Sequence, residues 1–135
     1  MDHNDKILDS FFNRRLNMFA TTSKDGYICI YILPNKLFCI IKHPTNSFYE
    51  KVFLSSNPFP TVIAFDKKNN VLSSYSLSGI LIKSIEIIIN ADKISEINAY
   101  FNIYGGAFKD RICIQLKKGL SIFLNVPFFD KNEDK

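Results

Sequence analysis

Three segments with one shared pattern decide the fold: DGYICIY at residues 25–31, NNVLSSY at residues 69–75 and KDRICIQ at residues 109–115. In each segment, two turn-forming residues precede a short run of β-branched, aromatic or small residues. Asp-Gly and Asn-Asn tolerate positive φ, as the tight turn of a β-hairpin requires. Each segment therefore predicts a strand that directly follows a tight turn.

Similar short runs continue outward in both directions, and no segment sustains a helical period beyond two turns. Twelve strands fall into three groups of four, whose first strands begin near residues 6, 50 and 94. Units of about 40–45 residues with four strands are typical of propeller blades. The expected strands span residues 6–13, 17–22, 27–33, 37–42, 50–56, 61–66, 71–77, 80–88, 94–101, 102–107, 111–116 and 120–126.

This spacing predicts an all-β fold, a partial β-propeller of three tandem four-stranded antiparallel blades. The blades would cover about residues 6–43, 49–89 and 94–127 within a folded unit at residues 1–128, and the charged tail at 129–135 would be disordered. A β-sandwich or barrel is the alternative, because strands 8–12 residues apart also suit those folds.

Composition narrows the class of protein. The 135 residues are 47% hydrophobic, which allows one domain with a buried core, and the net charge of +4 is mild. Cys29, Cys39 and Cys113 form no C-x-x-C pair, which argues against a zinc site or a disulfide framework and suits a reducing compartment. The polar N-terminus has no apolar signal-peptide core, so we expect a soluble, cytoplasmic protein.

Several stretches resemble a known family. Residues 25–33 and 36–43 resemble a WD repeat, with Tyr31 in the place of the Trp of that repeat. More specifically, the chain resembles the C-terminal WD-repeat propeller of BEACH-domain (neurobeachin-like) proteins. The stretches that carry this resemblance are RLNMFATTSKDGY at 15–27, IKHP at 41–44, VFLSSNPFP at 52–60 and LSSYSLSGILI at 72–82.

The resemblance implies WD-type blades and a non-catalytic scaffold in vesicle or lysosome-related membrane traffic, cytoplasmic and peripheral to membranes. Three blades cannot close a ring, because propellers have about four to eight. The rest of a longer chain, or self-association, would therefore complete the propeller.

The chain departs from the WD pattern at the Trp-Asp pair, which every repeat lacks. We therefore expect the Asp-His-Ser/Thr-Trp network of regular WD blades to be absent or eroded. His43 lies near the position of the repeat's His, but the sequence offers it no obvious partner. The pairs at the Trp-Asp positions are Tyr31-Ile32, Tyr75-Ser76 and Gln115-Leu116.

Catalytic, cofactor and metal sites are not predicted. His43 stands without a nearby thiol or carboxylate in sequence, and no Ser or Cys has the spacing of a nucleophile beside a base. The pair Gly105-Gly106 is too short for a phosphate-binding loop. We therefore expect a protein that is not an enzyme and that binds no cofactor.

Partner binding is expected at the turns. Turns between second and third strands would form a basic rim that attracts acidic or phosphorylated peptides, or an anionic membrane. Phe59, in the Asn57–Pro60 turn, would either anchor a partner or pack against the neighbouring blade. Arg14, Arg15 and Lys36 lie on the opposite face, so charge does not select one face. The residues of the expected rim are Lys24, Lys67, Lys68 and Lys109.

Nucleic-acid binding is not expected, because Lys and Arg are scattered rather than gathered on one element. The alternative function is that of a small β-barrel that binds a ligand or single-stranded nucleic acid on aromatic side chains. The aromatic residues considered for that role are Phe11, Phe12, Tyr100 and Phe101.

Overall fold

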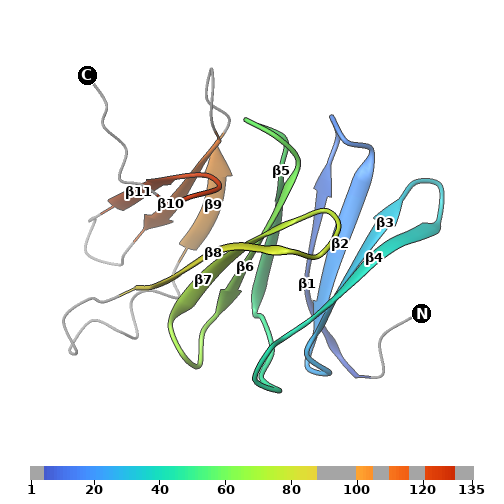
Figure 1. Ribbon diagram of the computed structural model, residues 1–135, viewed down its shortest axis with the longest axis horizontal. Coiled ribbons are helices and arrows are strands. Elements are labelled where there is room, and N and C mark those ends of the chain that lie inside the picture. Colours follow the sequence, from blue (N-terminus) through green and yellow to red (C-terminus); the bar gives the residue numbers. More distant parts are fainter. Residues whose placement is uncertain (1–4, 88–99, 105–109, 116–120, 130–135) are drawn as a thin grey trace.

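The computed structural model describes residues 5–87, 100–104, 110–115 and 121–129, and these form three antiparallel sheets (Figure 1). The first sheet has the order β1-β2-β3-β4, the second β5-β6-β7-β8 and the third β9-β10-β11. The strands are β1 (Ile7–Asn13), β2 (Met18–Ser23), β3 (Tyr27–Ile32), β4 (Lys36–Lys42), β5 (Lys51–Ser55), β6 (Thr61–Asp66), β7 (Val71–Ser76), β8 (Leu81–Glu86), β9 (Tyr100–Tyr104), β10 (Arg111–Gln115) and β11 (Ser121–Asn125).

The all-β class and the first two groups of four strands are confirmed, each with consecutive strands side by side. The alternative of a closed barrel is wrong for the described residues, because each sheet is open and none shares a strand with its neighbour. β9, at residues 100–104, runs through the expected break between strands at 94–101 and 102–107, so that boundary is wrong. The rest of both ranges lies outside the described residues. The charged tail also lies outside them, apart from Phe129.

The third sheet differs from the sequence alignment by one strand. Asp110, directly before β10, binds the start of the β5–β6 turn at Ser56 and Asn57, so β10 begins at the same end of the sheets as β2 and β6, whereas β3 and β7 begin at the opposite end. This pattern makes β10 the equivalent of β2, whereas the sequence matched Arg111–Gln115 to the third strands. The alignment was wrong because alternating apolar residues occur in any central strand and do not number it.

Two apolar clusters join the three sheets. Consecutive side chains of β6 point to opposite faces, so Val62 and Ala64 pack toward the first sheet while Ile63 and Phe65 pack toward the third. All six residues of β6 are buried. Each large apolar side chain buried in this way contributes about 1.5–3 kcal/mol. The second sheet is therefore covered on both faces, and the sheets follow one another like blades.

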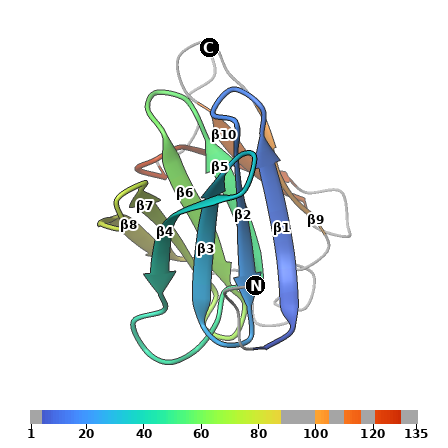
Figure 2. The ribbon, with the colours of Figure 1, turned by 90° about the vertical axis from the view of Figure 1, so that its right-hand side faces the viewer.

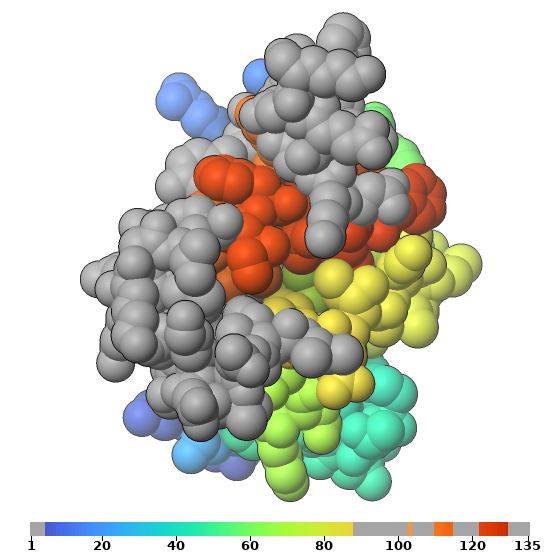
Figure 3. All heavy atoms as spheres, turned by 90° about the vertical axis from the view of Figure 1, so that its left-hand side faces the viewer, coloured from blue at the N-terminus to red at the C-terminus, as the bar shows by residue number. Residues whose placement is uncertain are grey.

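The first strands of the sheets lie closest together. β1 contacts β5, and β5 contacts β9. The rings of Phe11 and Phe53 meet edge to face with centroids 5.5 Å apart, and Phe11 packs against both apolar clusters. Figure 3, which views the third sheet from outside, shows residues of β11 next to those of β8. The sheets are thus fixed to one another along their first strands and through their faces.

Candidate functional site

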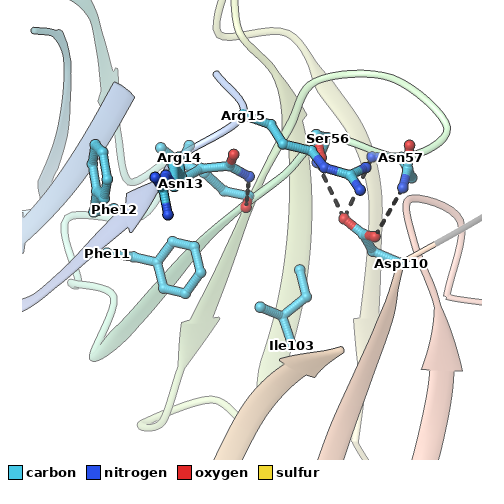
Figure 4. A pocket seen from close by; sticks show the side chains of 10 residues that line it. Phe11, Phe12, Asn13, Arg14, Arg15, Ser56, Asn57, Ile103 and Asp110 are labelled. Carbon is cyan, nitrogen blue, oxygen red and sulfur yellow. Dashed lines mark hydrogen bonds between the residues drawn. The ribbon is translucent and has the colours of Figure 1, made fainter. Parts of the chain in front are cut away.

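A cleft opens at the end of the molecule where the β1–β2 and β5–β6 turns meet the third sheet (Figure 4). We call it the end cleft, and its volume is about 430 Å³. This volume lies within the range of about 300–1,000 Å³ found for ligand pockets. The residues that line it are Phe11, Phe12, Asn13, Arg14, Arg15, Leu54, Ser56, Asn57, Ile103 and Asp110.

The end cleft combines an apolar floor with a basic rim. In Figure 4 the Phe11 ring and the Ile103 side chain point toward each other across the floor. Arg14 and Arg15, in the turn that follows β1, are both exposed at the rim. A guanidinium group presents a planar fork of donors that matches a carboxylate or phosphate. The cleft therefore offers an apolar contact and two cationic donors to one ligand.

Asp110 holds the far wall of the end cleft in place. Its carboxylate accepts hydrogen bonds from the Ser55 hydroxyl at 2.6 Å and from the Ser56 N–H at 3.1 Å. The backbone N–H and the side-chain amide of Asn57 donate to it as well, both at 3.4 Å. Asp110 is 6% exposed. These four donors fix the third sheet to the β5–β6 turn, so Asp110 acts as a structural anchor.

Asn13 fixes the arginine turn on the opposite wall. Its side-chain amide donates to the Leu54 carbonyl at 2.7 Å, and its side-chain oxygen accepts the N–H of Leu16 at 3.1 Å. Arg14 and Arg15 thus extend from a turn that is bound at both ends. The sequence showed the arginine pair but gave no sign that a cleft lies beside it.

The expected basic rim lies at the opposite end of the sheets. Lys24 and Lys68 are exposed there, and Lys67 lies 4.0 Å from the carboxylate of Glu50. Lys109 is outside the described residues, but the next residue, Asp110, belongs to the end cleft. The structure therefore brings the turns of Lys24, Lys67 and Lys68 to one end and does not place the neighbourhood of Lys109 with them.

Phe59 lies in the β5–β6 turn, which also supplies Ser56 and Asn57 to the end cleft. Its side chain is 40% exposed. The ring is therefore partly accessible to a partner at the cleft end of the molecule.

The expectation that His43 lacks a partner is wrong. His43 is 4% exposed, and its Nε2 lies 2.8 Å from Oδ2 of Asp66. The backbone N–H of Thr45 donates to Nδ1 of the same ring at 3.1 Å, so Nδ1 carries a lone pair and Nε2 carries the proton. The Asp66 carboxylate also accepts the N–H and the side-chain amide of Asn69. A neutral imidazole therefore donates to a buried carboxylate.

Tyr49 and Tyr75 extend this polar cluster, and Tyr75 stands where the resemblance placed a Trp. The His43 and Tyr49 rings lie 4.6 Å apart between centroids, and the hydroxyls of Tyr49 and Tyr75 are 2.5 Å apart. Burial is the main reason that the pKa of each tyrosine is raised above its ordinary value. The cluster borders a second hollow of about 400 Å³ that also includes Ser73. A His–Asp–Tyr network thus stands where an eroded one was expected.

Two features are missing from the described part of the chain. No three His, Cys, Asp or Glu side chains gather there as metal ligands would. The same residues contain no helix with the length and apolar character needed to cross a bilayer. Cys29, Cys39 and Cys113 are not joined in disulfides, and burial raises the pKa of Cys39.

Solved structures similar to this chain are β-propellers. BamB from Moraxella catarrhalis matches with a TM-score of 0.70 at 9% identity, over 94% of this chain and 37% of that chain. The fold is that of a partial β-propeller. The Dos1 propeller matches with a TM-score of 0.56 at 17% identity, over 96% of this chain and 36% of that chain. The partial propeller therefore spans little more than a third of either chain.

No family model matches the partial propeller, and no curated protein matches it significantly. Identities of 9% and 17% establish the fold alone. WD repeats and a BEACH-type context therefore rest on the sequence resemblance.

Proposed function

We propose that this partial propeller is a non-catalytic interaction module whose end cleft binds an acidic peptide segment with an apolar anchor. The observation that supports this proposal is the placement of Arg14 and Arg15 above the Phe11 floor. The only carboxylate that lines the described cleft, that of Asp110, is already bound by four donors. A peptide carboxylate would bind at the rim while an apolar side chain enters the floor.

Two sequence expectations bear on this choice. The basic rim of Lys24, Lys67 and Lys68 is a less suitable site, since Lys67 already lies near Glu50 and the hollow beside its turn is lined by the Asp66 carboxylate. The wider proposal, a BEACH-type scaffold in vesicle or lysosome-related traffic at cytoplasmic membranes, is supported only by the stretches at 15–27, 41–44, 52–60 and 72–82.

Peptide binding can be tested with a fluorescein-labelled nonapeptide that is rich in Asp and Glu and contains one Phe. We expect the double variant Arg14→Glu/Arg15→Glu to weaken binding at least about tenfold, which is about 1.4 kcal/mol. The matched control Lys67→Glu/Lys68→Glu has the same change in net charge at the opposite end and should bind within about twofold of the wild type. Fluorescence anisotropy at two salt concentrations gives both affinities.

Equal losses in both double variants would show a general charge effect and contradict a site in the end cleft. Absence of binding to the acidic peptide up to about 1 mM, a free energy of about −4 kcal/mol, would contradict the proposal as a whole. An oligothymidylate probe tests the alternative class. Binding to it that falls steeply with salt would favour a nucleic-acid partner.

A further inference from the structure

Figure 2 looks onto the outward face of the first sheet, with β1 to β4 toward the viewer. This face carries a row of large apolar side chains. Phe12 pairs with Phe19, and Phe19 pairs with Tyr31, so these three lie on the same side of β1, β2 and β3. The rings of Phe19 and Tyr31 stack with centroids 4.7 Å apart. Leu37 pairs with Tyr31 and extends the row to β4.

The next row on this face is also uncharged. Ser10 pairs with Thr21, Thr21 with Cys29, and Cys29 with Ile40. Phe12 is 50% exposed and Ile40 is 49% exposed. A charged residue enters only one row further along, where Lys42 pairs with Tyr27. We call the two uncharged rows the outer face of the first sheet.

When one face of a sheet is in water, the residues along each strand normally alternate between polar ones on that face and apolar ones on the core face. The second sheet, which is covered on both sides, instead has apolar residues on both, as Val62 and Ile63 show. In the same way β3 points Ile28 and Ile30 to the core and Cys29 and Tyr31 outward. The first sheet therefore has the sequence of a sheet that is covered on both sides.

We propose that a second copy of this chain covers the outer face, with the same face of both copies in contact across a twofold axis. The outer face is suited to this arrangement because its rows carry no charge, so self-contact brings no like charges together. Oligomers with such a self-complementary interface are the commonest kind. This inference does not depend on the peptide site.

Copies that close a ring by head-to-tail contact would fit these surfaces less well than a face-to-face dimer. It would place the outer face of the first sheet against the outward side of the third sheet. Ile112 and Leu124 of the third sheet face its core, so their paired neighbours Arg111 and Asn125 face outward. Contact with Phe12 and Ile40 would place a guanidinium and an amide against apolar side chains, which is less favourable than contact between two uncharged faces.

The size of the outer face sets the strength of the dimer. Four strands about 4.8 Å apart and six residues long, at about 3.3 Å each, give a face of about 400 Å². A standard stable interface covers about 800 Å² on each partner. We therefore infer a weak dimer that dissociates in the micromolar range or above.

The test is the molar mass of the full chain by sedimentation velocity from about 5 to about 300 µM, a span chosen to include a micromolar dissociation constant. The wild type should shift from its 15.5 kDa monomer mass toward twice that mass as concentration rises. Ile40→Lys should remain monomeric throughout. Ile80→Lys is the matched control, since Ile80 is 67% exposed in the β7–β8 connection and should not affect the dimer.

Phe123→Lys distinguishes the two modes of assembly. Phe123 lies on the outward side of the third sheet, so its replacement should leave a face-to-face dimer intact and should break head-to-tail closure. A wild type that stays monomeric to the highest concentration, or an assembly that Phe123→Lys abolishes, would overturn the inference. Circular dichroism melts of each variant verify that the fold is retained. Peptide binding by a monomeric wild type would separate failure of this inference from failure of the proposed function.

Discussion

Replacement of Asp66 by Ala tests how strongly the buried His–Asp pair stabilises the partial propeller. The variant removes the acceptor of the His43 Nε2–H at 2.8 Å and of two donors from Asn69, at 3.2 and 2.8 Å. His43 is 4% exposed, so water cannot easily replace the lost acceptor. A buried N–H donor that loses its acceptor costs about 1–3 kcal/mol, and the lost bonds from Asn69 to the carboxylate add to this cost. We therefore expect Asp66→Ala to lower the free energy of unfolding by about 3–4 kcal/mol.

Urea denaturation followed by circular dichroism measures this loss. Asp9→Ala is the control, because Asp9 accepts a single described hydrogen bond, from the Val52 N–H at 3.0 Å, and should cost about 1 kcal/mol. Addition of His43→Ala to Asp66→Ala completes a double-mutant cycle. The pair should show a coupling energy of about 1.5–3 kcal/mol. For a chain of this size, the loss of unfolding free energy in Asp66→Ala should lower the melting temperature by roughly 10 °C.

The reasoning would be refuted by a coupling energy near zero between His43 and Asp66. It would also be refuted if Asp66→Ala cost no more than Asp9→Ala. Either result would mean that this cluster adds little to the contact between the first two sheets, and that their apolar cluster alone holds them together.

Two further predictions concern single positions. Gly26 and Gly79 have φ of 87° and 89°, and a Cβ at Gly26 would lie 2.7 Å from the Ser47 carbonyl oxygen, whereas Gly79 has room. Gly26→Ala should therefore cost about 3 kcal/mol or more, but Gly79→Ala only about 1 kcal/mol, in urea titrations; equal costs would contradict the contact. Because burial raises the pKa of Tyr49 and Tyr75, stability should be full below about pH 10 and fall at higher pH, as thermal melts would show. Tyr49→Phe should make that decline shallower, and an unchanged slope would contradict the assignment.

The sequence predicts the strands of this fold well because local chemistry decides them. The turn at Asp25-Gly26 needs positive φ, and the structure places Gly26 there with φ of 87°. The runs that follow such turns become β3 and β7 within one or two residues of the expected bounds. Alternation also predicts which side chains share a face, since its period belongs to the strand itself.

The candidate site could not be predicted in the same way, because its contacts join distant parts of the chain. Asp110 binds Ser55, 55 residues earlier, and Asp66 binds His43, 23 residues earlier. The alternation of residues along a strand predicts that a carboxylate faces inward. It does not predict which residue of another sheet the carboxylate binds. The expected match of β10 to the third strands failed for the same reason, because Asp110, directly before β10, lies at the end of the sheets opposite Lys24. Turns that look alike in sequence lie at opposite ends of the sheets.

The first sheet shows where sequence and structure give different information about function. β3, with the sequence YICIYI, has apolar residues at every position, which is the pattern of a strand buried on both sides. Among the described residues, an apolar cluster that includes Ile28 and Ile30 covers one side of the first sheet, while Phe12 and Ile40 are exposed on the other. Surface selection for solubility alone would have replaced an exposed Phe12 or Ile40 with a polar residue at no cost to packing. The retained apolar character is therefore best explained by contact with another sheet. Because Phe12 also lines the end cleft, this contact would adjoin the arginine rim where the peptide is proposed to bind.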